Sequence, residues 1–149
     1  MERVNLGKTA PELYKAVLEL ENLSMQKVKQ AGLDIGFSHL LKLKASQINQ
    51  CAFCVRMHTQ DAIKAGESME RIALISAWRE SGYFSEQERA ALILIEEITL
   101  IANQHFPDSA YQEAAKVLSE AKITAIEWVA IVINAWNRIA ISSQYAVKP

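Results

Sequence analysis

The chain has 149 residues, half of them hydrophobic and 22% charged, as in one globular domain with a single core. Its sixteen basic and seventeen acidic residues leave a net charge of -1, which argues against nucleic acid or an acidic membrane surface as a main partner. No apolar run is long enough to span a bilayer, and MERVNLGKTAPEL lacks the apolar core of a signal peptide, so we expect a cytoplasmic protein.

The residue usage favours helices over strands. Only five glycines and three prolines occur, while Ala, Leu, Glu, Lys and Ile are abundant, and these are mostly good helix formers. No long linker, low-complexity tract or internal repeat divides the chain. We therefore predict one all-α domain over residues 1–149, a bundle of about six or seven helices.

The first long helix is predicted to follow Thr9, which forms a possible capping box with Glu12. Its apolar stripe continues until Gly32, a residue that commonly ends a helix. A second helix is predicted in IGFSHLLKLKASQI, residues 35–48, because apolar residues recur there at helical spacing.

A third helix is predicted over about residues 50–65, with Asn49 as its N-cap and Gly66 after its end. Ser68 can cap a short fourth helix. Ser85 forms a second capping box with the glutamate three residues later, and ERAALILIEEITLIANQ predicts a strong helix after it. HFPD then predicts a loop, and Ser109 a further short helix.

The last predicted helix opens with Thr124 and contains WVAIVINAW, which is apolar on nearly every side. A helix without a polar face has to be buried all round, either at the centre of the domain or between subunits. We therefore expect a homo-oligomer. Trp136, Asn137 and Arg138 later in this helix are expected to supply core packing and an ion pair.

Both cysteines of the chain lie in CAFCVRMH, where Cys51, Cys54 and His58 are spaced to share one face of a helix. Near a helix N-terminus, unpaired N–H groups stabilise a thiolate. His58 can stabilise the Cys54 thiolate when protonated, or accept the thiol proton when neutral. An oxidised thiolate becomes a sulfenic acid, which a neighbouring thiol converts to a disulfide. The cluster therefore indicates redox chemistry, although a close cysteine pair is also found in zinc sites and in cores.

The segment KLKASQINQCAFCVRMHTQDAIKAGES, residues 42–68, resembles the alkylhydroperoxidase D-like branch of the carboxymuconolactone decarboxylase family. SGYFSEQERAALILIEEIT and NAWNRIAI are similar to the family's central and last helices, so the resemblance extends over residues 37–141. It implies an all-helical homo-oligomer, often a trimer, a hexamer or another multiple. It also implies a thiol-dependent peroxidase, an antioxidant oxidoreductase that needs neither metal nor organic cofactor.

The resemblance also assigns roles. Cys54 would attack the hydroperoxide, Cys51 would resolve the sulfenic acid as a disulfide, and His58 would transfer protons. An external dithiol, such as a dihydrolipoyl or thioredoxin-like protein, would reduce the disulfide. The family usually has a glutamate twelve residues before the first cysteine, and His39 occupies that position here. We expect His39 to take part in the proton relay, and Asp61 either to orient the His58 ring or to be a solvated residue.

Two other interpretations remain open. Cys51, Cys54, His58 and His39 make a plausible set of zinc ligands, which would indicate a metal-held structural or sensory module. The same fold could instead serve a regulatory, partner-binding protein without turnover. In both alternatives the cysteines perform no catalytic cycle.

Overall fold

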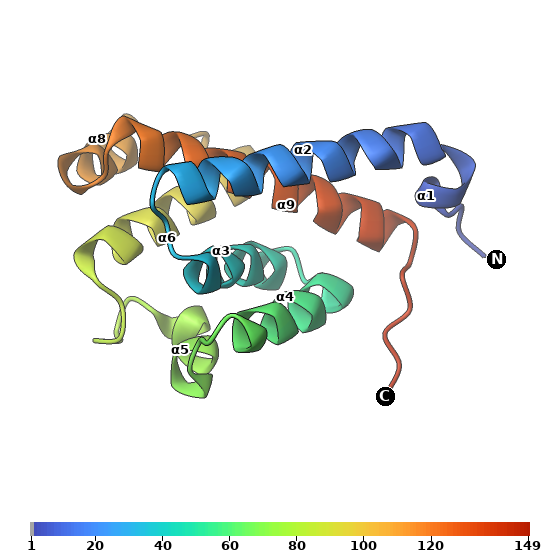
Figure 1. The fold of residues 1–149 in the computed structure, drawn as a ribbon, viewed down its shortest axis with the longest axis horizontal. Coiled ribbons are helices and arrows are strands. Elements are labelled where there is room, and N and C mark those ends of the chain that lie inside the picture. Colours follow the sequence, from blue (N-terminus) through green and yellow to red (C-terminus); the bar gives the residue numbers. More distant parts are fainter. Residues whose placement is uncertain (1) are drawn as a thin grey trace.

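A computed structural model describes residues 2–149, and it contains helices and no strand in that part of the chain. The predicted all-α domain is therefore confirmed (Figure 1). The helices in chain order are α1 (Leu6–Thr9), α2 (Pro11–Gln30), α3 (Ile35–Ile48), α4 (Ala52–Lys64), α5 (Met69–Leu74), a 3-10 helix (Ile75–Ala77), α6 (Glu86–Thr99), α7 (Ile101–Gln104), α8 (Asp108–Val117) and α9 (Glu120–Ser142).

The two longest helices, α2 and α9, lie side by side, and α3 packs against α9, α6 and α4 (Figure 1). Large aliphatic side chains fill the core between them; among those buried completely are Leu40, Leu41, Leu92, Leu94, Ile95, Ile126 and Ile133. Within one chain α9 is not buried all round, since Trp128 and Ile131 are 42% and 47% exposed. No helix between residues 2 and 149 has both the length and the apolarity needed to cross a membrane.

Several predicted boundaries are confirmed. Helix α3 covers residues 35–48 as expected, and its N-cap is Asp34, whose carboxylate accepts from the amide of Phe37 at 2.8 Å. Ser68 caps α5, and the capping box of Ser85 is present at α6. In each of these places a side-chain oxygen satisfies an amide that has no partner within its helix.

The predicted caps at Thr9, Ser109 and Thr124 are wrong. Thr9 belongs to α1 and donates its hydroxyl to the Asn5 carbonyl, while α2 begins at Pro11 without a side-chain cap. Ser109 lies inside α8. The last helix begins before Thr124, because Ser119 accepts from the amide of Lys122 and caps it. Ser or Thr followed by an acidic or amide residue recurs in the sequence, and packing selects which of them caps a helix.

Glu96 of α6 is partly buried and connects three other segments. Its carboxylate accepts from Trp78 Nε1 at 2.8 Å and pairs with Arg79 Nη2 at 2.5 Å and Lys44 Nζ at 3.2 Å. Burial raises the pKa of Glu96, but the hydrogen bonds from Arg79 and Trp78 and the charge of Lys44 outweigh it, so the pKa is lowered overall. Through Lys44 this carboxylate ties α6 to α3.

We predict that Glu96→Gln lowers the free energy of unfolding at pH 7 by about 2 kcal/mol, because hydrogen bonds to a charged group are lost. A carboxyl group whose pKa is lowered by folding stabilises the folded protein at pH values above its unfolded-state pKa of about 4.3. This stabilisation is lost as the pH falls through the lowered folded-state pKa. The difference between wild type and variant should therefore shrink below about pH 4. Urea unfolding at several pH values measures it. Glu80→Gln, at an exposed position, is the control, and a pH-independent difference would contradict the assignment.

Candidate functional site

The turn between α3 and α4 fixes the position of Cys51. Asn49 ends α3, and Gln50 then adopts a left-handed conformation with φ of 56°. The Cys51 amide donates back to the Ser46 carbonyl at 3.0 Å. Cys51 itself caps α4, and its Sγ accepts from the amide of Cys54 at 3.4 Å. The predicted N-cap at Asn49 is therefore wrong. Asn49 is the C-cap of α3, and after the turn at Gln50 the N-cap of α4 is Cys51, whose sulfur takes the place of the usual side-chain oxygen.

The Asn49 side chain belongs to a buried amide network that holds this turn. Its Nδ2 donates to Asn134 Oδ1 at 2.9 Å and to Asn137 Oδ1 at 2.8 Å, both in α9. Asn137 Nδ2 donates in turn to Ser46 Oγ at 3.0 Å, and Arg138 donates to the carbonyl and side-chain oxygens of Asn134. Among residues 2–149 Arg138 forms hydrogen bonds to Asn134 in place of the predicted ion pair.

Cys51 and Cys54 form a disulfide at the beginning of α4, with their Cα atoms 5.3 Å apart. Each cysteine is only 1% exposed. They pack against Ala140 of α9 and against Tyr145 in the segment that follows α9. The two sulfurs therefore lie together at the start of α4, as the spacing predicts, and the amide of Cys54 points toward the Cys51 sulfur.

His58 lies one turn after Cys54 and is 5% exposed. Neither of its ring nitrogens has a hydrogen-bond partner among the described residues. Burial, the charge of Lys42 and the charge of His39 lower the pKa of His58 to about 3. With this disulfide in place His58 is therefore neutral at physiological pH, whereas the sequence alone suggested that it titrates near neutrality.

His39 lies on α3 and faces His58 across the α3–α4 interface. The ring centroids are 5.8 Å apart, with planes 25° from parallel. Asp61 of α4 lies beside both rings, with Oδ2 3.7 Å from His58 Nδ1 and 4.0 Å from His39 Nδ1. Burial and Lys42 lower the pKa of His39, while Asp61 and Glu21 oppose them. The structure thus brings the two histidines together and places the Asp61 carboxylate, which the sequence suggested as a partner of the His58 ring, beside both of them.

Lys42 is a member of this neighbourhood that the sequence analysis did not single out. It is 2% exposed and forms an ion pair with Glu21 of α2. Its Nζ also lies 3.2 Å from the sulfur of Met25. The sequence could have indicated Lys42, because a lysine three residues after His39 shares a helix face with that ring. It could not have indicated Glu21, which is remote from His39 in the sequence.

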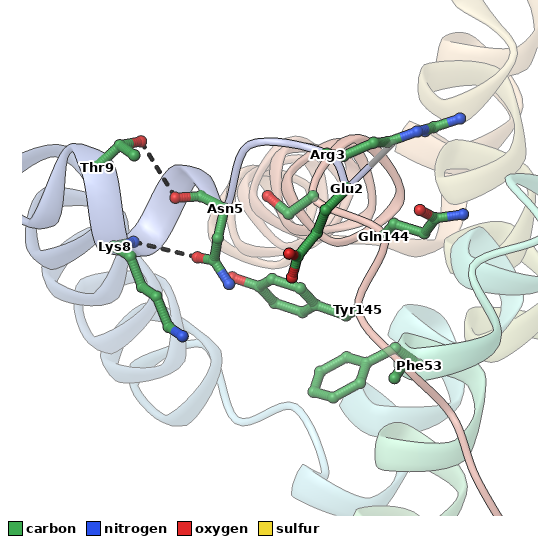
Figure 2. A pocket seen from close by; sticks show the side chains of 10 residues that line it. Glu2, Arg3, Asn5, Lys8, Thr9, Phe53, Gln144 and Tyr145 are labelled. Carbon is green, nitrogen blue, oxygen red and sulfur yellow. Dashed lines mark hydrogen bonds between the residues drawn. The ribbon is translucent and has the colours of Figure 1, made fainter.

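Tyr145 packs against the two cysteines, and Phe53 lies beside Tyr145. Tyr145 and Phe53 meet edge to face with centroids 5.2 Å apart. Beside them a pocket of about 510 Å³ opens between the two ends of the chain, and Asn5 and Glu2 lie next to the Tyr145 ring there (Figure 2). Arg56 holds the last segment in place by donating to the Lys148 carbonyl at 3.1 Å. Because each cysteine is only 1% exposed, a reagent in solvent reaches the sulfurs only after the segments around them move.

The zinc set of two thiolates and two histidines is not assembled in this state. Cys51 and Cys54 are bonded to each other, and a disulfide sulfur offers no thiolate to a metal. The histidines are grouped with Asp61 instead.

Comparisons with known proteins agree with this architecture. The uncharacterized protein YdfG of Bacillus subtilis strain 168 is 38% identical over 141 residues, which are 95% of this chain and 93% of that protein. A crystal structure from Agrobacterium tumefaciens superposes with a TM-score of 0.88 at 41% identity and covers 100% of this chain and 99% of its own. That protein is described as one of unknown function and a candidate antioxidant defence protein AhpD. Residues 11–97, which include the cysteine motif, match the carboxymuconolactone decarboxylase family, and the chain therefore belongs to that family.

Proposed function

We propose that the protein is a thiol-dependent peroxidase that reduces hydroperoxides through a disulfide cycle of Cys51 and Cys54. The observation that carries the proposal is the buried pair of sulfurs at bonding distance at the start of α4. Family membership and the AhpD-like neighbour support it. Such a pair can give two electrons to an oxidant by forming a disulfide. A dithiol can then return two electrons and restore both thiols.

The cycle begins with both thiols reduced. The Cys54 thiolate attacks the terminal peroxide oxygen, the O–O bond breaks, and the alkoxide leaves as an alcohol after taking a proton. The peroxide gains two electrons, and Cys54 becomes a sulfenic acid. Cys51 then attacks that sulfur, the S–S bond forms, and the hydroxyl group leaves as water. The Cys54 amide that points at Cys51 stabilises the attacking thiolate in this second step.

His58 is the proton carrier in this scheme, since it lies one turn from Cys54 on the same helix face. In the disulfide form it is a weak base. In the reduced form a thiolate at Cys54 and the Asp61 carboxylate place negative charge near the ring, which favours its protonated form. We propose His39 as the second member of the relay, in the position where the family usually has a glutamate. The carboxylate of this relay is then Asp61, from the other helix.

The partners that follow are a hydroperoxide and an external dithiol of the dihydrolipoyl or thioredoxin-like kind, which resets the disulfide by exchange. We further propose that the chain assembles as a homo-oligomer. The exposed Trp128 and Ile131 on α9 support this, because large apolar side chains that are close together on a helix favour burial against another surface.

We predict that the reduced protein consumes cumene hydroperoxide and hydrogen peroxide over many turnovers when dihydrolipoamide is supplied. Peroxide loss is followed against the slow direct reaction of the dithiol. The same protein with both thiols blocked by iodoacetamide is the control and should show only that direct rate. Consumption no faster than the control with either peroxide would contradict the proposed function.

A further inference from the structure

The cluster of His39, His58 and Asp61 contains buried polar atoms that have no partner. His58 is only 5% exposed. Neither of its ring nitrogens accepts or donates a hydrogen bond among the described residues. The Nδ1 atom of His39 is buried and unpartnered as well. Unpaired buried groups of this kind are rare in native proteins, and an ion or a water is a common explanation. Two imidazoles with buried, unpartnered nitrogens beside one carboxylate are typical of a ligand site.

We propose that His39, His58 and Asp61 form a binding site for a divalent transition-metal ion of the zinc class. The geometry points to this because one ligand atom from each residue lies within 4.8 Å of the others. The Asp61 oxygen is 3.7 Å from His58 Nδ1 and 4.0 Å from His39 Nδ1. Two ligand atoms on one zinc ion are about 3.3 Å apart at usual bond lengths, so small side-chain rotations close the site.

The backbone supplies the ligands from two sides. His58 and Asp61 are three residues apart on α4, which places them as neighbours on one helix face. His39 comes from α3 opposite. The cluster also has an entrance, since the Asp61 and His39 side chains are 33% and 17% exposed while His58 is at the inner wall. Three protein ligands with an open side leave one position for water, as in many exchangeable zinc sites.

The donor set and the local charge decide which ion fits. Two imidazole nitrogens with one carboxylate oxygen favour Zn²⁺, Co²⁺ or Fe²⁺ over Mg²⁺ and Ca²⁺, which prefer oxygen ligands. Lys42 is the nearby positive group, and its ion pair with Glu21 offsets its charge. The site differs from the four-ligand set considered from the sequence, because it uses Asp61 and neither cysteine. It shares its three residues with the proton relay of the proposed peroxidase cycle, but metal binding there requires neither cysteine.

The test is a calorimetric titration of the oxidised, disulfide-containing protein with Zn²⁺, repeated with Co²⁺ and followed by visible absorption. We expect one ion per chain and no sulfur-to-cobalt charge-transfer band. Asp61→Asn and His39→Gln should each weaken Zn²⁺ binding at least tenfold. His105→Gln and Asp108→Asn are matched controls at exposed positions outside the cluster, and they should bind as wild type does. Excess Mg²⁺ should not displace the ion.

The inference is overturned if the oxidised protein binds no Zn²⁺ at 100-fold molar excess, or if both cluster variants bind as tightly as wild type. It is also overturned if binding occurs only after reduction and disappears in the Cys51→Ser protein, because the ligands would then be thiolates. Circular dichroism and thermal unfolding check the fold of each variant. If His39→Gln does not fold, Zn²⁺ binding to Asp61→Asn decides the test. That variant is expected to fold, because the Asp61 side chain is one-third exposed and the substitution is isosteric. None of these outcomes depends on peroxide turnover.

Discussion

Replacing Cys54 with serine is expected to abolish hydroperoxide turnover, with a loss of at least 1,000-fold that reaches the background of the assay. A serine hydroxyl at this position is not ionised near neutral pH and forms no sulfenic acid, so the O–O bond is not attacked. The fold should persist. The cross-link joins residues only three positions apart, so it closes a short loop and adds little to the entropy of unfolding.

Cys51→Ser separates the two sulfur roles and is the matched comparison. This variant should consume one equivalent of peroxide per chain and then stop, because Cys54 is oxidised and no second thiol resolves it. Multiple turnovers should be lost in both variants, while the first equivalent is lost only in Cys54→Ser. The opposite pattern, with a first turnover in Cys54→Ser and none in Cys51→Ser, would show that the roles are exchanged.

Asn137→Ala is expected to have the largest effect on stability, about 3 kcal/mol in the free energy of unfolding. Asn137 is completely buried in α9. Its side chain accepts from Asn49 and donates to Ser46, so truncation leaves polar groups without a partner in a site that also loses packing volume. Urea unfolding of wild type and variant measures the effect as a lower midpoint at similar slope.

Asn103→Ala is the control for this prediction, because Asn103 is exposed in α7, and it should change the free energy of unfolding by less than about 0.5 kcal/mol. The Asn137 variant carries a second readout. Since Asn49 ends α3 directly before the turn to Cys51, a loosened amide network should make the reduced thiols react faster with iodoacetamide. Equal stability and equal alkylation rates would refute the role of this network.

Much of the fold could be read from the sequence. Residues 35–48 are bounded as predicted because the apolar spacing and the flanking polar residues agree there. The capping box at Ser85 is confirmed for the same reason: the local signal and the packing favour one start. At Thr9 and Thr124 the same local pattern occurs without capping a helix. Contacts with other helices decide among such candidates, and the sequence does not display those contacts.

The candidate site was predictable along one helix but not across helices. The spacing of Cys51, Cys54 and His58 on α4 follows from the helical repeat alone. The contribution of Glu21 and the packing of Tyr145 against the cysteines arise from segments that meet the site only after folding. The neutral state of His58 also depends on burial, which residue type and spacing do not report.

The attack of Cys54 on peroxide is tested most directly in the Cys51→Ser protein, where the first product has no thiol partner. The reduced variant is mixed with one equivalent of cumene hydroperoxide in the presence of dimedone, which captures sulfenic acids, and the peptide containing residue 54 is analysed by mass spectrometry. We expect the dimedone adduct on Cys54 in most chains, together with loss of the peroxide. An unmodified Cys54 thiol beside unconsumed peroxide would contradict the proposed chemistry.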